Sequence, residues 1–331
     1  MNRQARCWVL NLDAEHELET LGTYTPSAHM RSIVAAQQRK LVGTLLGPDD
    51  VLLTEANLDE YTESGTLRGL PGLAWCPTPR ALSMLRAVGA VPESAPSVDV
   101  LRGVNARPFA SEVRAPLAQA SFEKHLATHL DVALEQLAQP AAQGWLVRRT
   151  FGAAGRGRRR LTGGKPSAHD RAWLNASLRL GPLTIEPWVE IETEYTRSGW
   201  VESGGAVLIA PPCFQRTSRE GAWEHTATAD PDLVHSADDQ LLQQAVEQAG
   251  RALARAGYFG AFGIDAFRHR VPGGSHRQLV LNPMSEINAR FTMDWTLGMG
   301  ERTPHHAAGE PGVATTCADP LGSSPMPGTR L

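Results

Sequence analysis

The apolar positions of the first hundred residues follow two different spacings. Short apolar runs at residues 7–12 and 51–54 predict buried strands, whereas apolar positions between residues 30 and 45 recur at roughly helical spacing and stop at Gly47. A second helix is predicted between Thr78 and Gly89. Thr78 would be its N-cap, Pro79 lies in its first turn, and Gly89 ends it. Strands that alternate with helices indicate a parallel, layered α/β unit.

A stretch rich in proline and serine at residues 92–97 marks a candidate domain boundary. After it, apolar residues recur at helical spacing from Phe122 to Leu137, which predicts an amphipathic helix that ends at Pro140. This helix would carry His125 and His129 four residues apart. They are either candidate metal ligands or a packed or solvated histidine pair.

The second half of the chain is predicted to contain mainly strands. Residues 144–149, 183–191 and 206–210 have the apolar and β-branched content of strands, and a helix is predicted from Ser236 to Gly257. Two later apolar runs, around residues 258–267 and 278–284, are separated by a segment that contains Pro272 and two glycines. We expect them to form a hairpin.

Composition indicates an ordinary globular protein. The chain has 331 residues, of which 42% are hydrophobic and 20% charged, enough for two or three compact units. Its net charge of −3 gives no general attraction to nucleic acid or to an anionic membrane, and no apolar run is long enough to span a bilayer. We therefore expect a cytoplasmic protein with no nucleic-acid or membrane partner.

The cysteines and the end of the chain offer no functional motif. The four cysteines stand far apart, which favours free reduced thiols over a disulfide framework or a zinc motif. Residues 301–331 are rich in proline and glycine and contain no aromatic residue, so we expect a disordered tail there.

A glycine-rich loop at residues 152–157 is the first candidate binding site. Glycines at this density let backbone N–H groups approach an anion, and the surrounding arginines add positive charge, so phosphate is the natural ligand. A mobile hairpin with solvated arginines is the alternative. The loop lacks the Gly-Lys-Ser/Thr ending of a Walker A motif, and the first strand lacks the glycine fingerprint of a nicotinamide or flavin site.

Carboxylates form two further candidate sites. Those between Glu186 and Glu194 follow a predicted strand, where they would suit a nucleoside or simply belong to a charged edge strand. Near the end of the predicted hairpin, Glu286, Asn288 and Arg290 occupy every second position, so a strand would send all three to one face. The hairpin would also bring Asp265 close to them, and such oxygen ligands suit a metal, although a solvated polar face is the alternative.

The order of these features resembles the ATP-grasp superfamily of ATP-dependent ligases over roughly residues 105–300. The resemblance implies an α/β fold, with an N-terminal α/β pre-ATP-grasp domain at residues 1–104 and a two-subdomain ATP-grasp fold with antiparallel sheets, α+β in character. The first subdomain, residues 105–181, would hold the glycine-rich loop. The second, residues 182–300, would hold the adenine hinge and the metal site.

The same resemblance implies roles for individual residues. Arg107 and Arg148 correspond to phosphate-binding cations that are more often lysine in the family, and Arg148 lies eight residues before Arg156, as in the biotin carboxylase branch. Arg290 would face the transferred phosphoryl group. The remaining implied residues are Gly152, Gly155 and Gly157 in the phosphate loop, Glu186, Val189 and Glu194 around adenine and ribose, and Asp265, Glu286 and Asn288 as Mg²⁺ ligands.

The activity that the resemblance implies is a Mg²⁺-dependent ligation that consumes ATP. A substrate carboxylate becomes an acyl phosphate, which an amine then attacks, so the partners are small carboxylates and amines, with amino acids and peptides among the candidates. A kinase and a catalytically silent ATP-binding regulator are the alternatives, and a homodimer is left open. One departure concerns Gly263, because several amino-acid ligases of the family have an arginine there.

Overall fold

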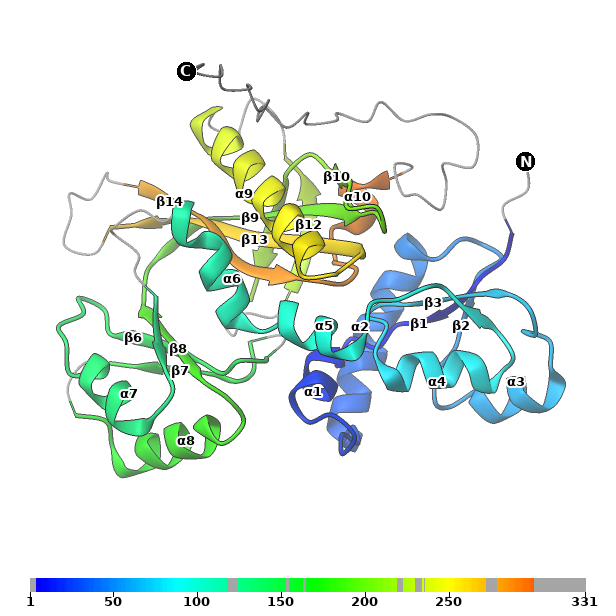
Figure 1. Cartoon of the computed structure of the whole chain (residues 1–331), viewed down its shortest axis with the longest axis horizontal. Coiled ribbons are helices and arrows are strands. Elements are labelled where there is room, and N and C mark those ends of the chain that lie inside the picture. The colour runs from blue at the N-terminus through cyan, green and yellow to red at the C-terminus, as the bar shows by residue number, and fades with distance from the viewer. Residues whose placement is uncertain are drawn as a thin grey trace, which may run out of the picture.

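The computed structural model describes residues 4–117, 124–152, 155–162, 165–218, 223–229, 234, 236–271 and 279–300. The predicted disordered tail at residues 301–331 lies outside these residues, as does the turn predicted around Pro272. The described part of the chain forms three sheets, with the N-terminal sheet on one side and a small lobe on the other side of a central sheet (Figure 1).

The N-terminal unit is the predicted parallel α/β layer. Its strands β1 (Cys7–Val9), β2 (Val51–Leu52), β3 (Pro71–Ala74) and β4 (Val91–Pro92) run in the order β2-β1-β3-β4, and every pairing is parallel. Helices connect them: α1 (Ala14–Glu19), α2 (Ala28–Leu45), α3 (Leu58–Ser64) and α4 (Pro79–Ala87). Thr78 precedes α4 without capping it; its hydroxyl oxygen accepts from Asn11 Nδ2 at 3.0 Å and its hydrogen is donated to Glu17 Oε2 at 2.6 Å.

The small lobe, residues 124–187, is an antiparallel sheet covered by two helices. Its strands are β5 (His125–Ala127), β6 (Trp145–Arg148), β7 (Arg158–Leu161) and β8 (Leu183–Pro187), in the order β5-β8-β6-β7. The helices α7 (Leu130–Leu137) and α8 (Ala168–Leu178) pack on this sheet and bury Ala133, Leu137 and Leu174. The predicted boundary at residue 182 falls just before β8, which belongs to this sheet.

The helix predicted from Phe122 to Leu137 is wrong in its first part. Residues 125–127 form β5 and pair with β8, and α7 begins only at Leu130, with His129 at its N-cap. Leu126 has the spacing of a helical core position, yet in the strand it is 48% exposed. Sheet pairing across almost sixty residues therefore overrides the local helical pattern, and the two histidines do not share a helix.

The central sheet contains the longest strands. Its members are β9 (Ile191–Val201), β10 (Val207–Ile209), β11 (Cys213–Thr217), β12 (Trp223–Thr228), β13 (Gly260–Arg270) and β14 (Leu279–Asn288), all paired antiparallel, in the order β12-β11-β9-β13-β14 with β10 beside β9. The predicted hairpin is confirmed, and Asp265 lies directly opposite Glu286.

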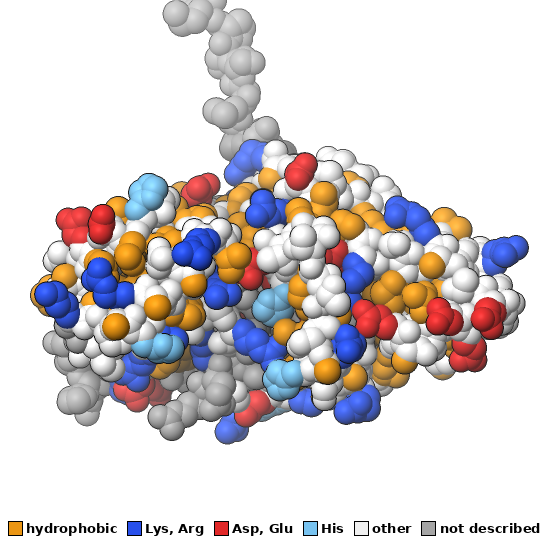
Figure 2. Space-filling view, turned by 90° about the horizontal axis from the view of Figure 1, so that it is seen from below, with side chains coloured by type: hydrophobic (Ala, Val, Ile, Leu, Met, Phe, Trp, Pro, Cys, Tyr) orange, Lys and Arg blue, Asp and Glu red, His pale blue; other side chains and the backbone are white. Residues whose placement is uncertain are grey.

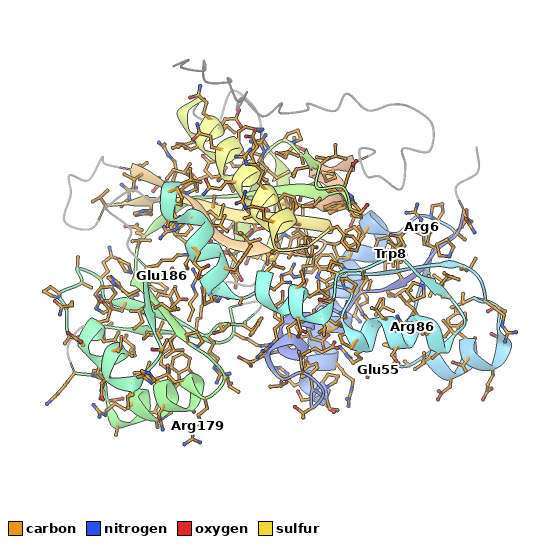
Figure 3. All side chains as sticks on the ribbon, viewed as in Figure 1. Arg6, Trp8, Glu55, Arg86, Arg179 and Glu186 are labelled. Carbon is orange, nitrogen blue, oxygen red and sulfur yellow. The ribbon has the colours of Figure 1, made fainter. Side chains whose placement is uncertain are left out.

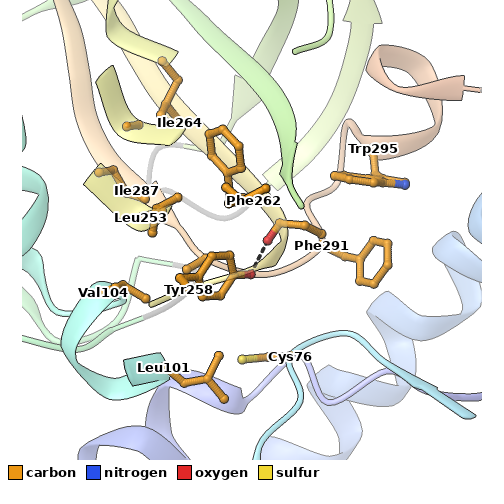
Figure 4. Packing of buried hydrophobic residues seen from close by; sticks show 14 of the residues in the cluster. Cys76, Leu101, Val104, Leu253, Tyr258, Phe262, Ile264, Ile287, Phe291 and Trp295 are labelled. Atoms are coloured by element: carbon orange, nitrogen blue, oxygen red, sulfur yellow. Dashed lines mark hydrogen bonds between the residues drawn. The ribbon is translucent and has the colours of Figure 1, made fainter. Parts of the chain in front are cut away.

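Helices α6 (Arg107–Arg114) and α9 (Ser236–Arg255) lie along the central sheet, and α5 (Val98–Val104) lies between α1 and α6. The remaining short elements are η1 (Ala115–Leu117), after α6, and α10 (Trp295–Gly298), after β14. The N-terminal unit and the central sheet share one hydrophobic core. In that core, Cys76 and Leu101 lie near Tyr258, close to Phe262 from β13 (Figure 4). The small lobe packs around a core of its own, with Leu174 and Ile185 at its centre. Among the described residues, no helix is both long and apolar enough to span a membrane.

Candidate functional site

A cavity of about 320 Å³ lies between the small lobe, the central sheet and α2, within the size range of small-molecule sites. The predicted site residues come together here from all three parts of the fold. The cavity is lined by Arg107, Arg148, Gly152, Gly155, Glu186, Val189, Glu194, Asp265, Glu286, Asn288 and Arg290. Gly157 is not among the lining residues. It lies at the start of β7, where its carbonyl accepts from the Arg149 amide at 2.8 Å.

Two arginines meet one carboxylate at the centre of the cavity. Arg107, the first residue of α6, places Nη1 2.7 Å from Glu286 Oε2 and donates from Nη2 to the Gly152 carbonyl at 2.9 Å. Arg148, the last residue of β6, lies 3.6 Å from the same Glu286 oxygen and 2.5 Å from Glu186 Oε1. Although burial acts to raise it, the pKa of Glu286 is lowered by these two cations.

Lys124 completes this network and was missed by the sequence analysis. Its Nζ donates to the Ser285 carbonyl at 2.8 Å and lies 3.7 Å from Glu186 Oε2. Burial lowers the pKa of Lys124 to about 7, against the opposing effect of Glu186. The sequence signal was hidden, because this lysine lies inside the segment whose apolar spacing predicts a helix.

Glu186 itself lies where the small lobe meets α6 (Figure 3). Its carboxylate is 2% exposed, and Arg148 and Lys124 lower its pKa although burial raises it. On the face seen in Figure 2, Lys and Arg side chains gather over the small lobe at the left. On this face, therefore, basic side chains lie on the lobe that carries the glycine-rich loop, as they do at its inner edge.

The other end of the cavity holds the predicted metal ligands. Asn288 Nδ2 donates to Asp265 Oδ2 at 3.0 Å, and Asn288 Oδ1 accepts from Arg290 Nη2 at 2.9 Å. Arg290 also donates to Glu15 Oε1 of α1 at 2.6 Å and lies over the Trp75 ring. The three side chains predicted to share one face thus all line the cavity, and Asn288 and Arg290 are in direct contact, although Arg290 lies beyond the end of β14.

The donor set at this end fits a divalent cation. Burial, with Glu286 and Asp294 nearby, raises the pKa of Asp265 to about 7, and none of the described cationic side chains forms an ion pair with it. A hard cation such as Mg²⁺ would reverse that shift, since it prefers oxygen ligands and would balance the buried charge. The described residues contain no group of three His, Cys, Asp or Glu side chains, so Asn288 would have to serve as the third protein ligand.

Local geometry requires glycine at three positions of the glycine-rich loop. A Cβ atom at Gly152 would lie 2.5 Å from the Arg156 carbonyl oxygen, and Gly155 and Gly157 have φ angles of 77° and 69°. The backbone therefore takes a left-handed turn at both Gly155 and Gly157. Val189 follows β8, is 9% exposed and packs on Phe267. Glu194 accepts hydrogen bonds from the amide and the hydroxyl of Thr217.

The departure at Gly263 has a steric cause. A Cβ atom at this position would lie 2.7 Å from Thr292 Cγ2, so the loop after β14 occupies the space that an arginine would need. Instead of an arginine, a cluster of buried polar side chains lies at the edge of the cavity. Thr196 and Ser198 both donate to Asp294, and Ser198 also exchanges a hydrogen bond with Thr292 at 2.9 Å. No pattern in the sequence pointed to Asp294.

Comparison with known proteins shows which solved structures have a similar architecture. No protein-family model matches the sequence, and no curated protein matches it. Among solved structures, D-alanyl-alanine synthetase A from Vibrio cholerae is similar with a TM-score of 0.51 and 14% identity, over 93% of this chain and 95% of that one. A biotin carboxylase from Campylobacter jejuni is similar with a TM-score of 0.52 and 11% identity, over 90% of this chain and 67% of that one.

The chain has the ATP-grasp fold. The biotin carboxylase domain of the Hydrogenobacter thermophilus 2-oxoglutarate carboxylase is also similar, with a TM-score of 0.52 and 12% identity over 89% of this chain and 66% of that one. That structure is a complex with MgADP, ADP and bicarbonate, and the Campylobacter structure is a complex with a form of ATP. In an ATP-grasp fold the small lobe and the central sheet are the two antiparallel parts, and the cavity described here lies between them.

Proposed function

We propose that this protein is an ATP-dependent, Mg²⁺-dependent ligase that activates a carboxylate as an acyl phosphate and joins it to an amine. The observation that carries the proposal is the convergence of Arg107 and Arg148 with Asp265, Glu286 and Asn288 in one cavity of an ATP-grasp fold. Phosphoryl transfer depends mainly on positioning and charge neutralisation, and these residues are suited to both.

The nucleotide would lie along the small lobe. Glu186 and Val189 would border adenine, Glu194 would reach the ribose, and the loop at residues 152–157 would cover the phosphates together with Arg107 and Arg148. Mg²⁺ held by Asp265, Glu286 and Asn288 would supply charge neutralisation for the phosphates. Arg107 and Arg148 already share Glu286, so a polyphosphate would compete with this carboxylate for both cations.

Two steps follow. In the first, a carboxylate oxygen of the acid substrate attacks the γ-phosphorus of ATP, the bond to the β-phosphate oxygen breaks, and ADP leaves. In the second, the amine nitrogen attacks the acyl carbon, loses its proton, and expels inorganic phosphate. Arg290 would stabilise the developing negative charge, because no arginine fits at Gly263.

An assay of ADP release over pooled carboxylates and amines, with product masses, tests this function. ADP release that requires both an acid and an amine supports the ligase. Phosphorylation that needs no amine identifies a kinase, and nucleotide binding without turnover identifies a regulator. If millimolar ATP with Mg²⁺ produced no thermal shift, the nucleotide site itself would be disproved.

A further inference from the structure

The cavity extends past the metal end to a wall formed by the N-terminal unit. Helix α2 contributes Met30, Ile33, Val34 and Gln37, at positions i, i+3, i+4 and i+7, so these side chains form one stripe. All four are half-buried, whereas Leu41, one turn further on, is fully buried in the shared core. The apolar part of the stripe therefore faces the cavity.

This apolar stripe does not pack into any of the hydrophobic cores formed by the described residues. Met30, Ile33 and Val34 do not belong to any hydrophobic cluster formed by the described residues, although Leu45 on the same helix packs against the shared core. Met293 lines the same cavity, and so does Trp75, although its ring is almost completely buried in the shared core. Apolar surface of this kind, held beside a reaction centre, favours an apolar group on the substrate.

Two polar atoms of the same wall have no hydrogen-bond partner among the described residues. They are Gln37 Oε1 and His16 Nε2, both buried, on residues that line the cavity. A buried amide oxygen without a donor is unfavourable, so the Gln37 side chain would gain by turning its oxygen toward an N–H group of a ligand in the cavity. An amine is the natural donor.

Arg156, which belongs to the glycine-rich loop, borders the same cavity. Its Nη1 donates to the Met30 thioether sulfur at 3.2 Å, and the structure gives it no carboxylate partner among the described residues. Sulfur is a weak acceptor, and a guanidinium has several donors in a planar fork that matches a carboxylate. A carboxylate on the ligand would therefore replace the sulfur as the partner of Arg156.

We infer that this compartment, bounded by Ile33, Val34, Gln37, Trp75 and Arg156, binds an α-amino acid with an apolar side chain as the amine substrate. The side chain lies on the α2 stripe, the carboxylate binds Arg156, and the amine lies within reach of Gln37. That the bound amino acid reacts as the amine rests on the proposed ligase function. That it binds here is argued only from the residues that line the compartment.

Calorimetric titration of amino acids, with and without saturating Mg²⁺ and ADP, tests the compartment. We expect L-leucine to bind at least tenfold more tightly than L-serine, because a leucine side chain buries far more apolar surface. Leucinamide, which lacks the carboxylate, and 4-methylpentanoate, which lacks the amine, should each lose at least tenfold. Equal binding of leucine and serine, or no binding of leucine in either condition, would overturn the inference.

A matched pair of variants on α2 controls for folding. Ile33→Asn should weaken leucine at least tenfold and leave the affinity for ADP unchanged. Val42→Asn changes a similar side chain on the same helix, at a position that is 39% exposed, and should leave leucine binding unchanged. Equal loss in both variants, at equal melting temperatures, would show that the stripe is not the binding surface.

Arg156→Gln tests the carboxylate contact. It should weaken leucine and leave leucinamide unchanged, so that the two ligands bind alike. If it instead weakened ADP or ATP and left leucine unchanged, Arg156 would belong to the nucleotide and this part of the inference would fall. The titration with ADP alone separates the two proposals, because failure there contradicts the nucleotide site and leaves the leucine titration interpretable.

Discussion

The two walls of the cavity are held in place by different forces. The wall formed by α2 and Trp75 belongs to a unit that shares one hydrophobic core with the central sheet, so it is fixed relative to Asp265 and Glu286. The small lobe has a separate core and faces the same site mainly through charges, namely Arg148 with Glu286 and Lys124 with Ser285. Phe151 is the member of this lobe that enters the shared core, as far as the described residues show.

This difference separates the tasks of the two walls. Apolar packing is insensitive to the charge of a ligand, so the wall proposed to bind the amine substrate keeps its position whether or not a nucleotide is bound. The ion pairs of the small lobe use the same arginines that a polyphosphate would use. Nucleotide binding is therefore expected to alter how the small lobe is held, and to leave the opposite wall unchanged.

The largest expected effect comes from the carboxylates opposite each other on β13 and β14. Asp265→Asn and Glu286→Gln should each lower kcat more than about 100-fold, because each removes a proposed metal ligand at similar volume. Their effects on stability should be opposite. Asp265→Asn relieves a buried carboxyl without a cation, whereas Glu286→Gln leaves Arg107 and Arg148 without their shared anion.

Chemical denaturation and steady-state kinetics measure both quantities. A Glu286→Gln variant with full activity and an unchanged metal requirement would contradict the metal assignment. Equal destabilisation by the two substitutions would contradict the charge balance proposed for the site.

The second prediction compares the two cores through a matched pair of leucines, both fully buried. Leu174→Ala in the small lobe and Leu101→Ala in the shared core should each cost about 2–5 kcal/mol. Hydrogen exchange should then increase in β5–β8 alone for Leu174→Ala, and in both the N-terminal unit and the central sheet for Leu101→Ala. Uniform acceleration across the chain in both variants would show a single cooperative unit instead of two.

The most gradual expected effect, spread over several pH units, is a pH dependence of stability at the edge of the small lobe. The pKa of Lys124 is lowered from its usual value near 10.5 to about 7, so between these values the unfolded chain binds a proton that the folded chain does not. Stability should therefore rise with pH in this window, by at most about 1.4 kcal/mol per pH unit. The same denaturation series on Lys124→Met should lack this slope, and an unchanged slope would assign it to another group.

The sequence predicted those parts of the site whose neighbours are close along the chain. The β13–β14 pairing follows from two apolar runs around one turn, and it places Asp265 opposite Glu286. Lys124 could not be predicted in the same way, because the strand beside it pairs with β8 far along the sequence. The α2 helix was predicted correctly, but its periodicity alone does not say that Ile33 faces a cavity while Leu41 faces a core.

The hydrogen bond between Arg290 and Glu15 has a consequence for biosynthesis. It joins residues 275 positions apart, and Trp75 packs on the same guanidinium. A ribosome must therefore release almost three hundred residues before Arg290 can reach its partners, and until then the N-terminal unit holds Glu15 without its cation. Nascent chains that stop before β14 would lack this arginine and leave both Glu15 and the Trp75 ring without it.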